Sequence, residues 1–110
     1  MFYMSKTDQL VAVLTTEDNA VLASSLANEL LNKRLAACVN ITKIDSVYSW
    51  KGKIQNDSEY LAFFKTTKKN EKTLKNEIKK LHPYDVPEIA EINVNSMNKP
   101  YLDWLVDSTL

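Results

Sequence analysis

The apolar positions in the first third of the chain change from a continuous run to a four-residue spacing. Residues 10–15 (LVAVLT) form a β-branched apolar run of strand length. A helix over residues 16–34 is predicted next by a stripe of leucines: Leu22, Leu26 and Leu30. Thr16 is its expected N-cap, and Glu17 and Asp18 would lie in the first turn, where negative charge suits the helix dipole. The pattern therefore predicts a strand followed by an amphipathic helix.

The pattern beyond this helix changes to a two-residue period, which is typical of strands. The alternation shifts phase near residues 43–44, as a β-bulge would produce. The only glycine, Gly52, predicts a turn, and the polar residues 55–58 add further turn chemistry. We therefore expect a hairpin whose unequal arms are residues 35–54 and 59–66. Alternate residues beyond the phase shift share one face of the first arm: Ser46, Tyr48 and Trp50.

The second arm of this hairpin, EYLAFFKT, is apolar on both sides. Leu61 and Phe63 point to one face, and the other face carries Tyr60, Ala62 and Phe64. A strand that is apolar on both faces is buried on both faces. Because we expect helices on one side of the sheet only, the other side needs a cover. A second copy of the chain is the economical cover.

The C-terminal half returns to helix and strand patterns. A narrow apolar stripe predicts a helix over residues 67–81: Leu74, Ile78 and Leu81. The helix ends at His82, because the residue before Pro83 is pushed out of the α region. Residues 88–94 alternate as a half-exposed strand, and the segment from Asn98 onward predicts a short terminal helix.

The predicted order is thus β-α-β-β-α-β with a C-terminal helix. This is the split-βαβ, ferredoxin-like arrangement of the α+β class, with helices on one face of an antiparallel sheet. A chain of 110 residues is the size of one domain, so we expect residues 1–110 to form a single unit.

Composition narrows the classes of function. The chain has 45% apolar and 25% charged residues, as globular proteins do, and its formal net charge is zero. A neutral chain has no general attraction to nucleic acid or anionic lipid, and no apolar run approaches the roughly 20 residues of a membrane helix. The single cysteine excludes an intramolecular disulfide, and residues 1–10 lack a leader pattern. We expect a cytoplasmic protein that binds neither nucleic acid nor membrane.

The segment HPYDVPEI, residues 82–89, concentrates the candidate chemistry. His82 is the only histidine, and with Asp85 and Glu88 it could serve acid–base chemistry or a metal site. The alternative is that His82 only ends the helix, where a partly positive ring is favourable. Cys38 is either a small buried apolar residue or a reactive thiolate. The lysines of the second predicted helix are either a solvated face or a phosphate-binding one.

Four segments together closely resemble the CutA family of divalent-cation tolerance proteins. They are VLTTEDNAVLASSLANELLNKRLAACVNI, SVYSWKGKIQNDSEYLAFFKTT, HPYDVPEI and YLDWL, in this order between about Leu10 and Leu105. The resemblance implies a ferredoxin-like domain that assembles into a homotrimer similar to the PII-type signalling proteins. It also implies a binding or regulatory role in the response to metal ions, copper among them, with no enzymatic reaction and no required cofactor.

The same resemblance implies the site residues. Six motif positions would meet in a ligand-binding cleft between subunits: Trp50, Lys53, Glu59, Lys65, Tyr84 and Glu88. His82 matches the position linked to metal binding, and Cys38 matches the cysteine of the AAC segment, so this pair carries the metal prediction. Some bacterial members have two further candidate copper donors, but Thr15 and Leu81 occupy those positions here.

Two other functions stay open. Lysines beside a carboxylate and aromatic rings would accept an anionic metabolite, which would make the trimer a small-molecule sensor without a metal role. An enzyme would use His82 and Glu88 as acid and base.

Overall fold

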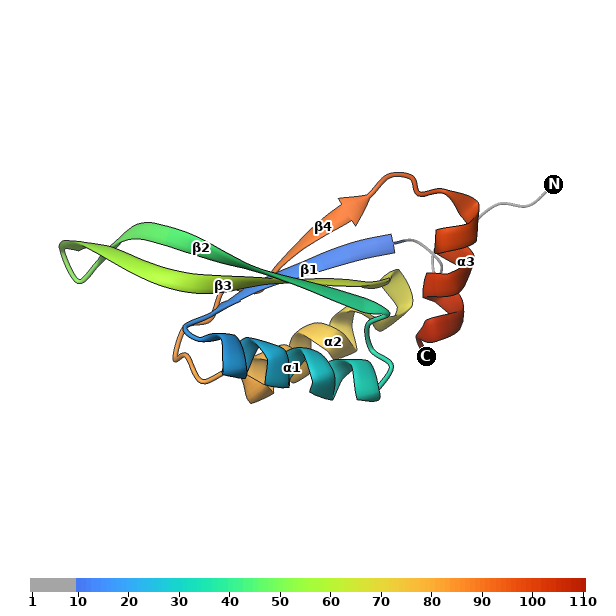
Figure 1. Ribbon diagram of the computed structural model, residues 1–110, viewed down its shortest axis with the longest axis horizontal. Helices are drawn as coiled ribbons and strands as arrows, with labels where there is room; N and C mark the ends of the chain where they lie inside the picture. The colour runs from blue at the N-terminus through green and yellow to red at the C-terminus, as the bar shows by residue number, and fades with distance from the viewer. Residues whose placement is uncertain (1–9) are drawn as a thin grey trace.

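The computed structural model describes residues 10–110 and has the predicted order of elements (Figure 1). The elements are β1 (Leu10–Glu17), α1 (Ala20–Asn32), β2 (Cys38–Trp50), β3 (Lys53–Thr67), α2 (Lys68–Leu81), β4 (Ala90–Val94) and α3 (Lys99–Ser108). All strand pairs are antiparallel, and the sheet order is β2-β3-β1-β4. This confirms the α+β, ferredoxin-like fold. The prediction that the chain starts without a leader pattern concerns mainly residues 1–9, which lie outside the part that the structure describes.

The main core lies between the sheet and the layer formed by α1 and α2 (Figure 1). The side chains without exposed surface in this core include Val13, Leu30, Ala62, Phe64, Leu74 and Ile78. They come from β1, β3 and both helices, so the predicted helical stripes face the sheet. The prediction is wrong at Leu22, which is 39% exposed in the first turn of α1, and at Leu81, which is 41% exposed because it ends α2 where the chain turns away from the sheet.

α1 begins later than the pattern predicts. β1 continues to Glu17, which pairs with Tyr60 of β3, and Asn19 caps the helix. The Asn19 Oδ1 accepts a hydrogen bond from the backbone N–H of Leu22 at 2.8 Å. The prediction that Thr16 is the cap is therefore wrong. Pairing with β3 satisfies the backbone through the end of β1, and the helix starts only after that pairing ends.

β2 and β3 form a long hairpin that extends beyond the helix layer (Figure 1). Their register is continuous along the whole of β2, so the predicted bulge is absent from this pair. Lys51 and Gly52 form the entire turn, and their φ angles of 51° and 78° suit a type I′ turn. Residues 55–58 belong to β3 rather than to a turn. Both expectations failed because no core lies against the outer hairpin to impose an alternation on its sequence.

The opposite side of the sheet has little helical cover, and we call it the open face. α3 covers one end of it, where Leu10 contacts Leu102 and Leu105 (Figure 1). Farther along β3, Leu61 and Phe63 are half-buried on this side. The alternation predicted for β3 is therefore confirmed, and one of its two apolar rows lies on the open face.

The apolar row of β4 also lies on the open face. Ile92 pairs in register with Ala12 and is 47% exposed. The neighbouring Glu91 points to the helix side, where its two carboxylate oxygens each lie 3.1 Å from a lysine Nζ of α2, those of Lys68 and Lys75. β4 is half-exposed as predicted, and the exposed row is the apolar one.

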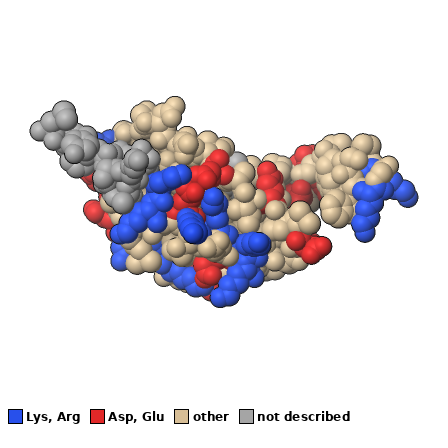
Figure 2. Space-filling model, turned by 180° about the vertical axis from the view of Figure 1, so that it is seen from behind, with Lys and Arg blue, Asp and Glu red and all other residues tan. Residues whose placement is uncertain are grey.

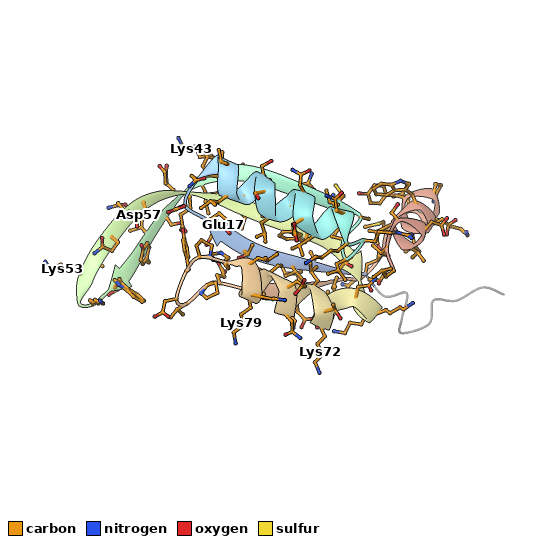
Figure 3. The ribbon with its side chains drawn as sticks, turned by 90° about the horizontal axis from the view of Figure 1, so that it is seen from below. Glu17, Lys43, Lys53, Asp57, Lys72 and Lys79 are labelled. Carbon is orange, nitrogen blue, oxygen red and sulfur yellow. The ribbon has the colours of Figure 1, made fainter. Side chains whose placement is uncertain are left out.

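The lysines of α2 lie on the outside of the helix layer. Lys72 and Lys79 point away from the sheet (Figure 3). Figure 2 shows lysine and acidic side chains interspersed over this side of the molecule. Mixed charges of this kind are typical of a solvated face. Within residues 10–110, no helix is long and apolar enough to cross a membrane.

Candidate functional site: an acidic–aromatic cavity on the open face

A cavity of about 560 Å³ lies on the open face, between the outer hairpin and the loop that follows α2. It is lined by Thr16, Ser46, Tyr48, Trp50, Glu59, Tyr84, Asp85, Val86 and Glu88. The lining combines three carboxylates with three aromatic rings, and we call this site the acidic–aromatic cavity. Its volume is in the range of sites that bind small molecules.

Strand geometry explains how one wall of this cavity forms. Side chains alternate across a strand, so the even-numbered residues of β2 share the open face. Their partners on β3 share the same face, because directly paired residues of antiparallel strands point the same way. This brings Tyr48 and Trp50 of β2 to the side that carries Glu59 of β3. The prediction that Ser46, Tyr48 and Trp50 share one face agrees with this register.

The phenol groups of two tyrosines hold carboxylates in place. The Tyr84 hydroxyl donates to the Glu59 Oε2 at 3.2 Å, and the Tyr48 hydroxyl donates to the Asp57 Oδ2. Burial and then the nearby Glu59 charge raise the pKa of Tyr84, and the hydrogen bond to Asp57 raises the pKa of Tyr48. Both phenols therefore remain protonated donors at neutral pH.

A second hollow of about 360 Å³ adjoins the cavity. The two share Tyr48, Glu59 and Tyr84 as a common wall. The second hollow adds the carboxylates of Asp18 and Asp57. Negative charge is thus concentrated where the hairpin leaves the body of the protein.

His82 fixes the loop but does not line the cavity. Its Nδ1 accepts a hydrogen bond from the Tyr84 backbone N–H at 3.1 Å, so the hydrogen of the ring lies on Nε2. The Nε2–H donates to the Thr16 carbonyl oxygen at 2.6 Å. The backbone of His82 also ends α2, since its N–H donates to the Ile78 carbonyl oxygen. The ring ties the loop to β1 and places Tyr84 against the hairpin.

A buried carboxyl lies beside this histidine. The Glu17 Oε1 is 3.5 Å from the His82 Nε2, and the Glu17 side chain is only 2% exposed. Its Oε2 has no hydrogen-bond partner within residues 10–110. Burial raises the pKa of Glu17, and His82 opposes that shift. Figure 3 shows Glu17 at the end of β1, beside α1.

The structure brings together four of the six residues predicted for the cleft: Trp50, Glu59, Tyr84 and Glu88. Lys53 and Lys65 do not line the cavity of their own chain, and their predicted place in a cleft between subunits stays a prediction. Each is six residues from Glu59 along β3, which corresponds to about 20 Å of strand. Lys53 lies beside the hairpin turn (Figure 3), and the Lys65 Nζ lies 5.7 Å from the ring centroid of Tyr101.

The two predicted metal ligands lie apart. Cys38 is half-buried and pairs with Lys65 on the open face, whereas the ring of His82 is fully buried beside Glu17 on the helix side. Both ring nitrogens of His82 are engaged in hydrogen bonds. Among the described residues, no three His, Cys, Asp or Glu side chains are placed to hold a metal ion. One chain therefore offers no preformed metal site within residues 10–110.

Sequence reasoning did not include several residues that line the cavity. Tyr48 is the clearest, and its signal was present because it alternates with Trp50 on one face of a strand. Val86 lies within HPYDVPEI between the candidate carboxylates. Thr16 could not be found this way, because its place depends on the pairing of β1 with β3.

Comparison with known proteins identifies the family. Residues 11–108 match the family of CutA1 divalent ion tolerance proteins. The chain belongs to the CutA1 family. Among its curated relatives, the divalent-cation tolerance protein CutA of Thermotoga maritima is 43% identical over 101 residues, covering 92% of this chain and 100% of that protein.

Solved structures of CutA1 proteins have the same fold. The crystal structure of CutA1 from Oryza sativa has a TM-score of 0.91 and 39% identity, covering 96% of this chain and 98% of that one. CutA1 from Pyrococcus horikoshii has a TM-score of 0.88 and 40% identity, covering 91% and 98%. The resemblance of the sequence to the CutA family is thereby confirmed.

Thr15 and Leu81, which replace two candidate copper donors in this CutA1-family chain, also lie on the helix side. Thr15 is fully buried, and its Oγ1 has no hydrogen-bond partner among the described residues. Leu81 lines a hollow of about 190 Å³ that includes Glu17 and Pro83. Neither position reaches the acidic–aromatic cavity.

Proposed function

We propose that this CutA1-family protein is a homotrimeric binding protein of the cytoplasm that acts in the response to divalent metal ions. The observation that carries this proposal is the open face, with its apolar row next to a cavity lined by carboxylates and aromatic rings. Its cytoplasmic location is proposed from the single cysteine. We further propose that it catalyses no reaction. In support, Glu88 lines the cavity, whereas the ring of His82 is buried elsewhere.

Trimer formation is supported by the unequal burial of β3. Leu61 and Phe63 are half-buried in a single chain and line a hollow of about 330 Å³ with little polar surface. Ile92 extends the apolar surface to the far edge of the sheet. Apolar surface of this kind marks a site of association. A second and a third copy of the chain would cover it.

The variant Leu61→Glu tests this surface. A carboxylate in the middle of a buried interface lacks a partner, so we expect the trimer to dissociate to single chains. Val21→Glu is the matched control, because Val21 is 77% exposed on α1 and lies on the helix side. Sedimentation velocity of both variants measures the result. A trimer that survives Leu61→Glu contradicts the proposed interface.

The metal part of the proposal concerns copper and other divalent ions. Because no three donors converge within the described part of one chain, we propose that any metal site is completed between subunits. Calorimetry with Cu²⁺, Zn²⁺ and Ni²⁺ tests this proposal. We expect saturable binding with a dissociation constant below about 100 μM, which corresponds to a binding free energy of about 5.5 kcal/mol. We expect binding to persist in His82→Ala, since both ring nitrogens are engaged. Loss of binding there would instead assign the metal to His82.

A second function is favoured by the aromatic walls. Tyr48, Trp50 and Tyr84 give the cavity the lining of a site for a small organic molecule, which would make the trimer a metabolite sensor. A thermal-shift screen tests this function, because a ligand that binds the folded state raises the unfolding temperature as its concentration increases. The anionic metabolite expected from the sequence would need lysines from another subunit, since Lys53 and Lys65 lie away from the cavity of their own chain.

A further inference from the structure

The charge of the acidic–aromatic cavity limits which ligands it can hold. Its lining includes Glu59, Asp85 and Glu88 and contains no lysine or arginine from the described part of the chain. The adjoining hollow adds Asp18 and Asp57, again without a basic side chain within residues 10–110. Within one chain, an anion that enters would therefore meet carboxylates and no basic side chain of the described residues. The electrostatic field therefore favours a positively charged ligand.

Two of these carboxylates are available to a ligand. Asp85 and Glu88 are exposed, and neither makes a side-chain hydrogen bond or ion pair within residues 10–110. Glu59 keeps one oxygen on the Tyr84 hydroxyl, which fixes the carboxylate at the shared wall. A cation in the cavity would thus meet one oriented carboxylate and two accessible ones.

The aromatic rings point to an organic cation rather than a bare metal ion. Trp50 and Tyr48 are large side chains that remain 50% and 41% exposed on a strand, beside these acids. The face of an aromatic ring attracts an ammonium or guanidinium group, with tryptophan the strongest partner. A metal ion needs converging oxygen, nitrogen or sulfur donors, and no group of three acidic, His or Cys side chains within residues 10–110 provides them.

We propose that the acidic–aromatic cavity binds a small organic cation, an ammonium or guanidinium group on an apolar body. The carboxylates of Glu59 and Glu88 face the charge, and the rings of Trp50 and Tyr48 pack against the body of the ligand. This assignment rests on the proposed binding role of the cavity and names the chemical class of its ligand. It replaces the anionic metabolite with a cation.

Three probes of matched shape and different charge test the proposal: 2-phenylethylammonium, 2-phenylethanol and 3-phenylpropanoate. The chain has two tryptophans, so the full-length variant Trp104→Phe leaves Trp50 as the fluorescent reporter in the cavity. We expect a saturable change with the ammonium probe and an affinity at least about tenfold higher than for the alcohol or the carboxylate. Equal affinity for the three probes overturns the proposal. So does the absence of a saturable fluorescence change with the ammonium probe up to about 10 mM, because a dissociation constant above that value means very weak binding.

Removal of single charges locates the binding site. In the same background, Glu59→Gln and Glu88→Gln are each expected to weaken ammonium binding several-fold and to leave the alcohol unaffected. Glu29→Gln is the matched control: it removes one carboxylate from α1, where Glu29 pairs with Lys33, and should leave binding unchanged. If the two cavity variants bind the ammonium as the control does, the cavity is not the site.

The oligomeric state of the same samples separates this inference from the proposed trimer. An intact trimer that binds no ammonium overturns the organic-cation assignment and leaves the trimer standing. A monomer that binds the ammonium overturns the trimer alone. If Glu88→Gln dissociates the trimer while ammonium affinity stays the same, a cationic side chain of a second copy occupies the cavity, and the assignment is wrong.

Discussion

The two faces of the sheet differ in what covers them, although the same strands form both. On the helix side, Ala62 and Phe64 of β3 have no exposed surface. On the open face, Leu61 and Phe63 from the same strand are half-buried, and Ile92 is 47% exposed. The helix side is complete within one chain, and the open face is not. The comparison indicates that folding stability comes mainly from the helix side, and the open face is left for the proposed association.

The largest effect should separate these two faces directly. Phe64→Ala removes a fully buried ring, so we expect the free energy of unfolding to fall by about 3–5 kcal/mol. Phe63→Ala removes the neighbouring half-buried ring of the open face. Its main effect should be on the concentration at which the proposed trimer dissociates. Chemical unfolding at several protein concentrations measures both effects, and equal, concentration-independent losses would break the comparison.

A medium effect concerns the carboxyl groups on the two sides. Glu17 is buried on the helix side, and burial raises its pKa above the ordinary value of 4.5. The folded state then holds this proton more tightly than the unfolded state, so the contribution to stability is present below pH 4.5 and is lost as the pH rises through the raised value. The wild type should lose about 1.4 kcal/mol of stability per unit of pKa shift. Glu17→Gln cannot ionise, so it should not show this loss.

The check is the unfolding temperature of wild type and Glu17→Gln from pH 4 upward. We expect the unfolding temperature of the variant to increase relative to that of the wild type as the pH rises. Glu59→Gln removes a less buried carboxylate from the open face and serves as the matched change. Parallel curves for wild type and Glu17→Gln would contradict the raised pKa, because they would mean that folding does not change the pKa of Glu17.

The smallest effect concerns the rim of the helix side. Hydrogen bonds from Lys68 and Lys75 lower the pKa of Glu91 to about 2. A lowered carboxyl pKa stabilises the fold above the unfolded value of 4.5, and this contribution is lost as the pH falls toward 2. The three side chains are 30–40% exposed, so Glu91→Gln should cost only about 0.5–1 kcal/mol at neutral pH. Urea unfolding at low and high salt measures this cost. A cost that does not depend on salt would contradict its assignment to the ion pairs of Glu91.

The sequence predicted the fold best where a core imposes a pattern. The stripe of α1 and the alternation of β3 are clear because one side of each element is buried against the helix layer or the sheet. The outer hairpin has no such core, so the bulge was predicted from a shift in alternation near residues 43–44 and the turn from the residue types at 55–58. The structure has neither feature there, because β2 and β3 pair in a continuous register.

The candidate site was predictable in part for a similar reason. Trp50, Glu59, Tyr84 and Glu88 were found from motif positions, and the hairpin register together with the loop after α2 brings them into one cavity. Lys65 fell within the same motifs, but spacing along an extended strand keeps it about 20 Å from Glu59. A motif indicates which residue types belong together, and strand geometry decides which of them meet in one chain.

The most direct test of the account is the mass of the wild-type protein in solution. If the open face is covered by other copies of the chain, light scattering at micromolar concentration should give three times the chain mass of 12.6 kDa. A mass of 12.6 kDa under the same conditions would mean that Leu61, Phe63 and Ile92 stay uncovered, and the account of the open face would be wrong.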